Sequence, residues 1–231
     1  FGGTTSNGTV KIYQYKIPTT TEWTSGNVIK GTDTTQVADK FYWTQLSTDI
    51  IGTSSGEQSG VKISLNGNGN IISIGSEWYG GNQGRVRIFQ YIEESWEQLG
   101  PQITNGNRTH PSSLSDDGTI VAVGTPFINN GAGMVNVYEY STPGIIGGSW
   151  TQIGEDIHGL NTTVGRFGVS VAISNDGSIV AAGAHKAVID GITVGYVGIY
   201  EYKIPTTTEW SSGNVIKGTD TGQVADKFYW T

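Results

Sequence analysis

The chain has no cysteine, and only 14% of its 231 residues are charged. Without cysteine the fold cannot depend on disulfide bonds, and cysteine usage does not indicate whether the protein resides in an oxidising or a reducing compartment. No run approaches 18 consecutive apolar residues, so we expect no membrane-spanning segment. Lys and Arg are few, and the formal net charge of −7 argues against a nucleic-acid partner. These absences leave a chain held together by its hydrophobic core.

Glycine is abundant instead, with 35 copies, and hydrophobic residues make up 35% of the chain. Much Gly, Thr, Ser and Asn with little charge is unlike a helical protein. β-branched and aromatic residues alternate with Gly, Asn and Asp clusters, as in short strands joined by tight turns. The composition therefore predicts an all-β fold.

Three kinds of short segment recur along the chain. The first ends in an aromatic pair, the second contains an Asx-Gly turn, and the third begins with Trp. They read GTVKIYQY (8–15), GRVRIFQY (84–91), GMVNVYEY (133–140) and GYVGIYEY (195–202); VKISLNGNGNIISIG (61–75), PSSLSDDGTIVAVG (111–124) and VSVAISNDGSIVAAG (169–183); and WTQLSTDI (43–50), WEQLGPQI (96–103) and WTQIGEDI (150–157). The order predicts units of four short antiparallel strands, as in propeller blades.

We expect a tandem β-propeller rather than a β-sandwich, which does not require such recurrence. The predicted units are a partial blade with a long insertion (1–44), two blades (45–103 and 104–157), and a blade with the repeated insertion (158–231).

A longer repeat overlies the short ones. Residues 15–44 return at 202–231 with two differences, Thr24 against Ser211 and Thr35 against Gly222, a period of 187 residues. The segment 16–40 is either an insertion between strands or a blade that lost its central strands. The chain contains one 187-residue period and part of a second, which suggests that it is a piece of a longer tandem-repeat protein.

The run RFGVSVAISNDGSIVAAGA (166–184) resembles the FG-GAP repeats of integrin-α-type propellers. Its Phe-Gly is Phe167-Gly168, and the Gly-Ala-Pro positions carry Gly75-Ser76-Glu77, Gly124-Thr125-Pro126 and Gly183-Ala184-His185. The W-x-Q-[IL]-G-x-x-I spacers are closest to a divergent subgroup in large surface proteins of marine microbes and algae. The chain departs from the motif at Gln58-Ser59-Gly60 and Arg108-Thr109-His110, where Phe-Gly is expected.

Integrin-type blades often carry an Asp-x-Asp-x-Asp-Gly calcium loop, which is absent here. SDDG and SNDG read as hairpin turns, so we assign neither a metal nor another cofactor. The three histidines, His110, His158 and His185, lack metal-ligand spacing and are expected in loops or at the surface. No catalytic motif accompanies the serines or carboxylates, so the chain is predicted not to be an enzyme.

Tryptophans at 43, 96, 150 and 230 begin equivalent segments, and we expect them to pack between blades. Trp78 and Tyr79 follow a predicted strand, and they are the candidate ligand-binding aromatics. Three glycosylation sequons begin at Asn7, Asn107 and Asn161, which would be modified in a secreted protein.

The predicted function is therefore a non-catalytic extracellular or cell-surface protein, structural or adhesive. It would associate with itself into a filament or surface layer, because identical surfaces recurring at fixed spacing make open assemblies. The alternative is a propeller that binds a glycan or another protein.

Overall fold

The computed structural model describes residues 7–16, 42–160, 164–202 and 210–217. Three four-stranded antiparallel sheets dominate it, here called the first, second and third blades. The first blade is β5 (Ser59–Leu65), β6 (Ile71–Ser76), β7 (Arg85–Ile92) and β8 (Ser95–Gln98); the second is β9 (Ser112–Leu114), β10 (Ile120–Thr125), β11 (Met134–Tyr140) and β12 (Trp150–His158); the third is β13 (Ser170–Ile173), β14 (Ile179–Ala184), β17 (Tyr196–Tyr202) and β18 (Trp210–Lys217). The prediction of an all-β fold built of four-stranded antiparallel blades is confirmed.

A half-blade precedes the first blade. β1 (Thr9–Val10) pairs with β4 (Ile50–Ile51), and β2 (Tyr13–Lys16) pairs with β3 (Tyr42–Gln45). These two pairs correspond to the third and fourth strands of a complete blade. The intervening residues 17–41, which hold most of the predicted insertion, lie outside the described residues.

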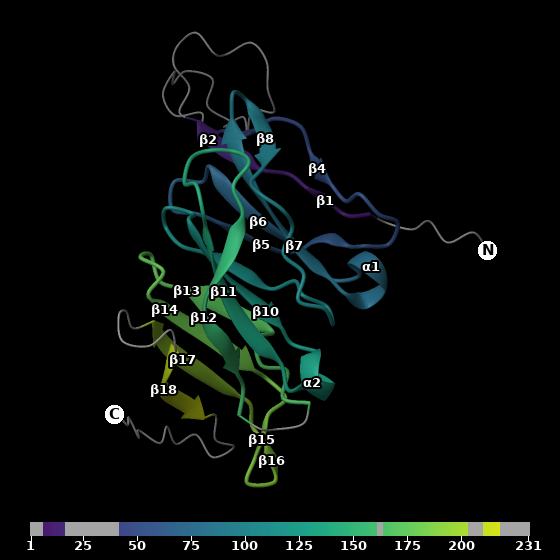
Figure 1. Cartoon of the computed structure of the whole chain (residues 1–231). Coiled ribbons are helices and arrows are strands. Elements are labelled where there is room, and N and C mark those ends of the chain that lie inside the picture. The colour runs from purple at the N-terminus through teal and green to yellow at the C-terminus, as the bar shows by residue number, and fades with distance from the viewer. Residues whose placement is uncertain (1–6, 17–41, 161–163, 203–209, 218–231) are drawn as a thin grey trace, which may run out of the picture.

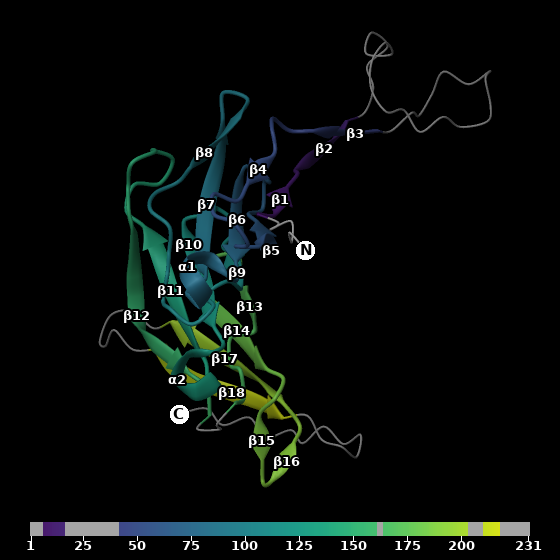
Figure 2. The ribbon, with the colours of Figure 1, turned by 90° about the vertical axis from the view of Figure 1, so that its right-hand side faces the viewer.

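The blades follow one another along the molecule, as Figures 1 and 2 show, and the described strands form open sheets rather than a closed ring. In each complete blade the loop after the second strand lies on the same side of the molecule. It holds the short turns labelled α1 (Tyr79–Asn82) and α2 (Ile128–Gly131), whose central residues have positive φ. In the third blade it holds the hairpin β15 (Val188–Ile189) and β16 (Ile192–Thr193). This side is called the loop edge below.

The Asp-Gly pairs form the predicted hairpin turns. Asp117 Oδ1 accepts hydrogen bonds from the Ser115 hydroxyl and from the backbone and hydroxyl of Thr119. Asp176 is held in the same way by Ser174 and Ser178. Both carboxylates are thus used inside their own turns.

The Gln of the W-x-Q motif stabilises a β-bulge in the fourth strand. In the second blade the register shifts between Val135 and Val137, and Gln152 Nε2 donates to the Gly154 carbonyl and to Asp156 Oδ1, at 3.3 and 3.0 Å. Gly154 has a φ of +69°, which explains the motif's glycine. Gln45 makes the equivalent contacts around Ser47, also at positive φ.

In three units the Trp near the start of the fourth strand lies against the Tyr near the end of the third strand. The ring centroids are 5.3 Å apart for Tyr15 and Trp43, 5.2 Å for Tyr91 and Trp96, and 5.0 Å for Tyr140 and Trp150. In the third blade Tyr202 pairs across the strands with Trp210. The predicted role of Trp230 lies outside the described residues, and the strand begins twenty residues earlier than the Trp motif suggested.

Glycines let the blades approach each other at the backbone. A Cβ on Gly124 would overlap the Gly168 carbonyl oxygen, and one on Gly133 would overlap that of Phe167. Gly75 meets His110 of the next blade in the same way. The recurring glycines at these motif positions therefore mark contacts between blades.

Candidate functional site: blade faces and a basic edge

Every blade has two different apolar faces. Its outgoing face, turned toward the next blade, carries aliphatic side chains, including Val86 and Ile88 in the first blade and Val135 and Val137 in the second. Its incoming face, turned toward the preceding blade, carries aromatic side chains of the third and fourth strands, such as Tyr140. Alternate residues of one strand serve the two faces, because neighbouring side chains point to opposite sides of a sheet.

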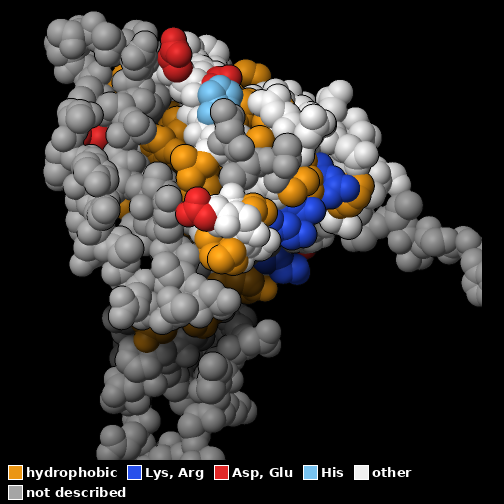
Figure 3. Space-filling model, turned by 90° about the horizontal axis from the view of Figure 1, so that it is seen from below, with side chains coloured by type: hydrophobic (Ala, Val, Ile, Leu, Met, Phe, Trp, Pro, Cys, Tyr) orange, Lys and Arg blue, Asp and Glu red, His pale blue; other side chains and the backbone are white. Residues whose placement is uncertain are grey.

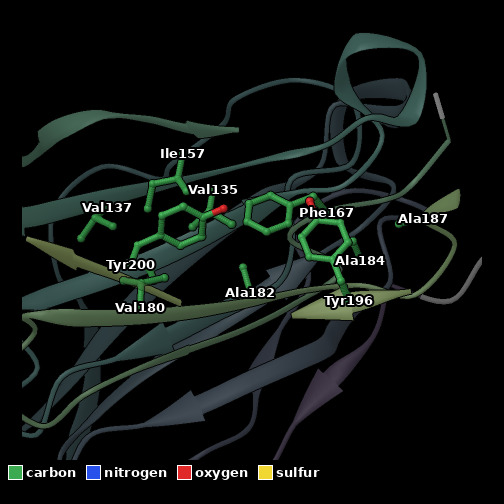
Figure 4. Close-up of a cluster of buried hydrophobic side chains, with 11 residues drawn as sticks. Val135, Val137, Ile157, Phe167, Val180, Ala182, Ala184, Ala187, Tyr196 and Tyr200 are labelled. Atoms are coloured by element: carbon green, nitrogen blue, oxygen red, sulfur yellow. The ribbon is translucent and has the colours of Figure 1, made fainter. Parts of the chain in front are cut away.

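Three buried clusters join the blades in series. One links the half-blade to the first blade, one links the first to the second, and one links the second to the third. Figure 4 shows the last of these, where Val135, Val137 and Ile157 of the second blade meet Phe167, Val180 and Tyr200 of the third. The same kind of contact thus recurs three times.

The outgoing face of the third blade is exposed. Val197 corresponds to Val86 and Val135; it is 40% exposed, whereas both of them are 0% exposed. Ile179 is 44% exposed, whereas Ile71 at the same position of the first blade is 7% exposed. Positions that a following blade covers elsewhere in the chain are therefore open to solvent here.

The incoming face of the half-blade is exposed as well. Trp43 is 61% exposed, but the equivalent Trp96 is 9% exposed. Tyr15 is 44% exposed against 2% for the equivalent Tyr140, and Tyr13 is 49% exposed. The two ends of the described array therefore present the two halves of one interface, aliphatic at one end and aromatic at the other.

A row of stacked arginine and aromatic side chains crosses the loop edge from blade to blade. The Arg108 guanidinium carbon lies 3.9 Å from the ring centroid of Trp78 and 4.7 Å from that of Phe127, and Arg166 lies 4.7 Å from Phe127. We call Trp78, Arg108, Phe127 and Arg166 the arginine ladder. In Figure 3 Lys and Arg side chains lie in a row beside hydrophobic ones, on the side that carries α1 and α2 in Figure 1.

The first blade also buries an ion pair that the sequence did not suggest. Glu57 is 0% exposed, and Arg85 Nη2 donates to both of its carboxylate oxygens, at 2.9 and 2.8 Å. Arg87 lies 3.8 Å away, and burial, followed by the charge of Arg85, lowers the pKa of Arg87. Arg85 further bonds Gln102 and Thr53, so the cluster ties together segments far apart in sequence.

Trp78 and Tyr79, the predicted ligand-binding aromatics, both lie on the loop edge beside arginines. Trp78 is 37% exposed and stacks on Arg108, while Tyr79 stacks on Arg85 at 3.9 Å. Trp78 keeps exposed ring surface, so its predicted contact with a ligand stays a prediction. No signal in the sequence placed Arg108 and Arg166 against the aromatic rings of the loop edge.

Two of the three sequon asparagines are described, and both Asn7 and Asn107 are exposed. Asn161 lies outside the described residues. His158 and His185 are exposed as expected, and His110 lies in the loop before β9, where it is 5% exposed rather than at the surface. The entry of the second blade is packed against the first there, and burial lowers the pKa of His110.

In the described part of the chain, no group of three His, Asp or Glu side chains gathers in a way that could hold a metal ion. A hollow beside the bulge of β12 is lined by Gln152, Gly154, Glu155, Asp156 and His158. Asp156 Oδ1 already accepts hydrogen bonds from Asn136 and Gln152, at 2.6 and 3.0 Å. Among the described residues no helix is long and apolar enough to cross a bilayer.

No known protein family and no curated protein sequence matches the chain. Solved structures do resemble it. A putative 6-phosphogluconolactonase from Bacteroides uniformis is 15% identical with a TM-score of 0.50, and the match covers 81% of this chain and 46% of that one. A functionally unknown protein from Desulfotomaculum acetoxidans is 19% identical (TM-score 0.48, 81% and 48% covered), and TolB from Acinetobacter baumannii is 14% identical (TM-score 0.44, 80% and 39% covered).

The chain therefore spans about half the length, or less, of these solved structures. The likeness to the Bacteroides uniformis protein corrects the prediction that the chain is not an enzyme, since the fold occurs in a protein described as a lactonase. At 15% identity the likeness shows the fold alone, and it assigns no reaction to this chain. The chain is an all-β protein of tandem four-stranded antiparallel blades, of the β-propeller type.

Proposed function

We propose that this chain is an extracellular structural or adhesive protein whose copies associate head to tail through their blade faces. One observation carries the proposal: Val197 at one end and Trp43 at the other are exposed, at positions that are buried or partly buried where two blades of this chain meet. Each exposed face is complementary to the opposite face of a second copy, so a second copy is the occupant that we propose.

The driving force is the burial of apolar surface. Fully burying a Val, Ile or Phe side chain contributes roughly 1.5–3 kcal/mol, and covering a half-exposed side chain contributes a corresponding part of that free energy. Ile179 and Val197 on the outgoing face, and Tyr13, Tyr15 and Trp43 on the incoming face, are all at least 40% exposed. Because the two faces differ, the contact is heterologous, and repeating it closes a ring or builds a filament.

The resemblance to FG-GAP blades supports a propeller of this family. Phe167 is 0% exposed in the cluster between the second and third blades, and Gly168 has a φ of +80°. Gly124, at the start of a Gly-Ala-Pro position, contacts the backbone of Gly168. These contacts give each of these motif positions a role in joining blades. We place the chain outside the cell because Asn7 and Asn107, both in sequons, are exposed.

A second candidate function is glycan binding on the loop edge, which the exposed ring surface of Trp78 favours. An exposed aromatic ring can stack on the apolar face of a sugar. Binding to a glycan array that disappears in Trp78→Ala would support this candidate, and an unchanged array profile would dismiss it.

Head-to-tail association is tested by light scattering coupled to size-exclusion chromatography over a range of concentrations. We expect the wild type to form species larger than one chain, and Tyr13→Lys and Val197→Lys each to shift it toward the monomer. Ile192→Lys is the matched control, because Ile192 is 55% exposed on the β15–β16 hairpin, away from both faces. A wild type that stays monomeric at all concentrations would contradict the proposal.

A further inference from the structure

The arginine ladder ends in a group of cations at the third blade. The loops that follow the second strand place Trp78 in the first blade, Phe127 in the second and Lys186 in the third at equivalent positions. The third blade thus has the cationic Lys186 at the position where the first two blades have an aromatic ring. Lys186 N donates to the Gly165 carbonyl at 3.2 Å, which holds Lys186 next to Arg166.

His185 completes this group, called the cation cluster: Arg166, His185 and Lys186. His185 and Lys186 are exposed, and Arg166 is half-buried with its guanidinium stacked on Phe127. Slight burial, followed by the positive charges of Arg166 and Lys186, lowers the pKa of His185. Among the described residues, the two charges that shift this pKa, those of Arg166 and Lys186, are both positive.

Two other arginines of the loop edge are neutralised by acids, whereas the cation cluster is not. Arg108 Nη1 lies 3.1 Å from Glu77 Oε1, and Arg85 lies 2.8 Å from Glu57 Oε2. Within the described ranges, no salt bridge involves Arg166, His185 or Lys186. A chain of net charge −7 thus gathers three basic side chains at one place, and no described acid pairs with them.

We propose that the cation cluster binds the sulfate or carboxylate groups of an acidic polysaccharide. Stacking on Phe127 fixes the Arg166 guanidinium plane, so less conformational freedom is lost when its N–H groups bind an anion. Lys186 and, when protonated, His185 add charge-assisted hydrogen bonds. The inference stands on the loop edge and does not depend on head-to-tail association.

A polymer fits this site better than a small free anion. The cluster lies on an exposed edge rather than in an enclosed cavity, so a single small anion stays hydrated and gains little. A polysaccharide places many anionic groups along one chain, so the second contact forms at high effective concentration.

The test is affinity electrophoresis of the whole chain in native gels that contain dextran sulfate, polygalacturonate or neutral dextran. We expect retardation by at least one of the two acidic polymers and none by dextran. The sulfated and the uronate gels show which anionic group is bound. Arg166→Gln and Lys186→Gln should each raise the apparent Kd about tenfold, as expected for a charge-assisted hydrogen bond.

Lys62→Gln is the matched control, because it removes one exposed positive charge from β5, outside the loop edge. We expect its Kd to stay within about twofold of the wild type, since only long-range charge changes. Circular dichroism of each variant checks that the fold is kept. No retardation of the wild type, equal weakening by Lys62→Gln, or equally tight binding of a single-stranded oligonucleotide would overturn the proposal.

Discussion

The indole nitrogen of Trp150 donates a hydrogen bond to the backbone carbonyl of Leu99, 2.8 Å away in the preceding blade. Trp96 donates in the same way to Leu46 of the half-blade, at 3.3 Å. The Trp of the W-x-Q motif in the first and second blades thus bonds the backbone of the motif's Leu in the unit before it. The bond gives the recurring Trp a role, because only its indole supplies the donor, whereas the acceptor is a backbone carbonyl.

Replacing Trp150 with Phe should keep most of the aromatic contact with Tyr140 and remove the bond to Leu99. Leu99 is 2% exposed, so we expect a loss of about 1–3 kcal/mol in the free energy of unfolding, measured in urea. Trp43→Phe is the control, because Trp43 is 61% exposed, and it should cost less than about 0.5 kcal/mol. Equal losses in the two variants would contradict the proposed role of the bond.

Gly133 should tolerate alanine poorly, because the new Cβ would overlap the Phe167 carbonyl oxygen. Gly144 has a similar φ, +77° against +83°, but an alanine Cβ there would meet no atom within 4 Å. Both substitutions carry the cost of a left-handed backbone, about 1–2 kcal/mol. The clash should lower the free energy of unfolding of Gly133→Ala by a further 1–3 kcal/mol or so. Similar urea midpoints for Gly133→Ala and Gly144→Ala would contradict this prediction.

The buried carboxylate of Glu57 should be essential for the first blade. Glu57→Gln leaves Arg85 and Arg87 buried without a counter-charge, and we expect it to cost about 3–5 kcal/mol in thermal or urea unfolding. Lys11→Gln breaks the exposed pair with Asp49, where Lys11 is 50% exposed, and should cost no more than about 1 kcal/mol. A mild effect of Glu57→Gln would mean that water reaches the cluster.

The turn carboxylate of Asp176 should make the stability depend on pH in the acidic range. Hydrogen bonds from Ser174 and Ser178 lower the pKa of Asp176 to about 2. A group with a lowered folded-state pKa stabilises the fold above its unfolded value, roughly 3.9, and loses that contribution as the pH falls toward 2. The free-energy difference between wild type and Asp176→Asn should therefore shrink from pH 5 to pH 2; a constant difference would contradict the assignment.

Local patterns predicted the parts of the fold that each blade makes by itself. The Asx-Gly turns, the alternating third strands and the Trp-led fourth strands follow from residues close in sequence. The third blade shows the limit. Its fourth strand begins at Trp210, in the sequence WSSGNVI, which lacks the Gln and Leu of the motif. In the first copy of the long repeat the motif begins instead at Trp43, so the pattern pointed to Trp230, the equivalent of Trp43.

The candidate site depended on contacts that no local pattern contains. Arg108 and Arg166 come from the junctions between blades, and the aromatic rings on which they stack come from loops at other places along the sequence, so no spacing rule joins them. Glu57 and its partner Arg85 are 28 residues apart in sequence, and no local pattern joins them. The exposed faces could be recognised only by comparing the burial of equivalent residues in successive blades.

The most direct measurement of the central claim is sedimentation velocity of two complementary variants, alone and mixed. Tyr13→Lys blocks the incoming face of the half-blade, and Val197→Lys blocks the outgoing face of the third blade. A head-to-tail contact predicts that each variant alone is monomeric, while an equimolar mixture forms dimers and nothing larger, because each partner keeps one intact face. A mixture that stays monomeric, or a single variant that still assembles, would contradict the account.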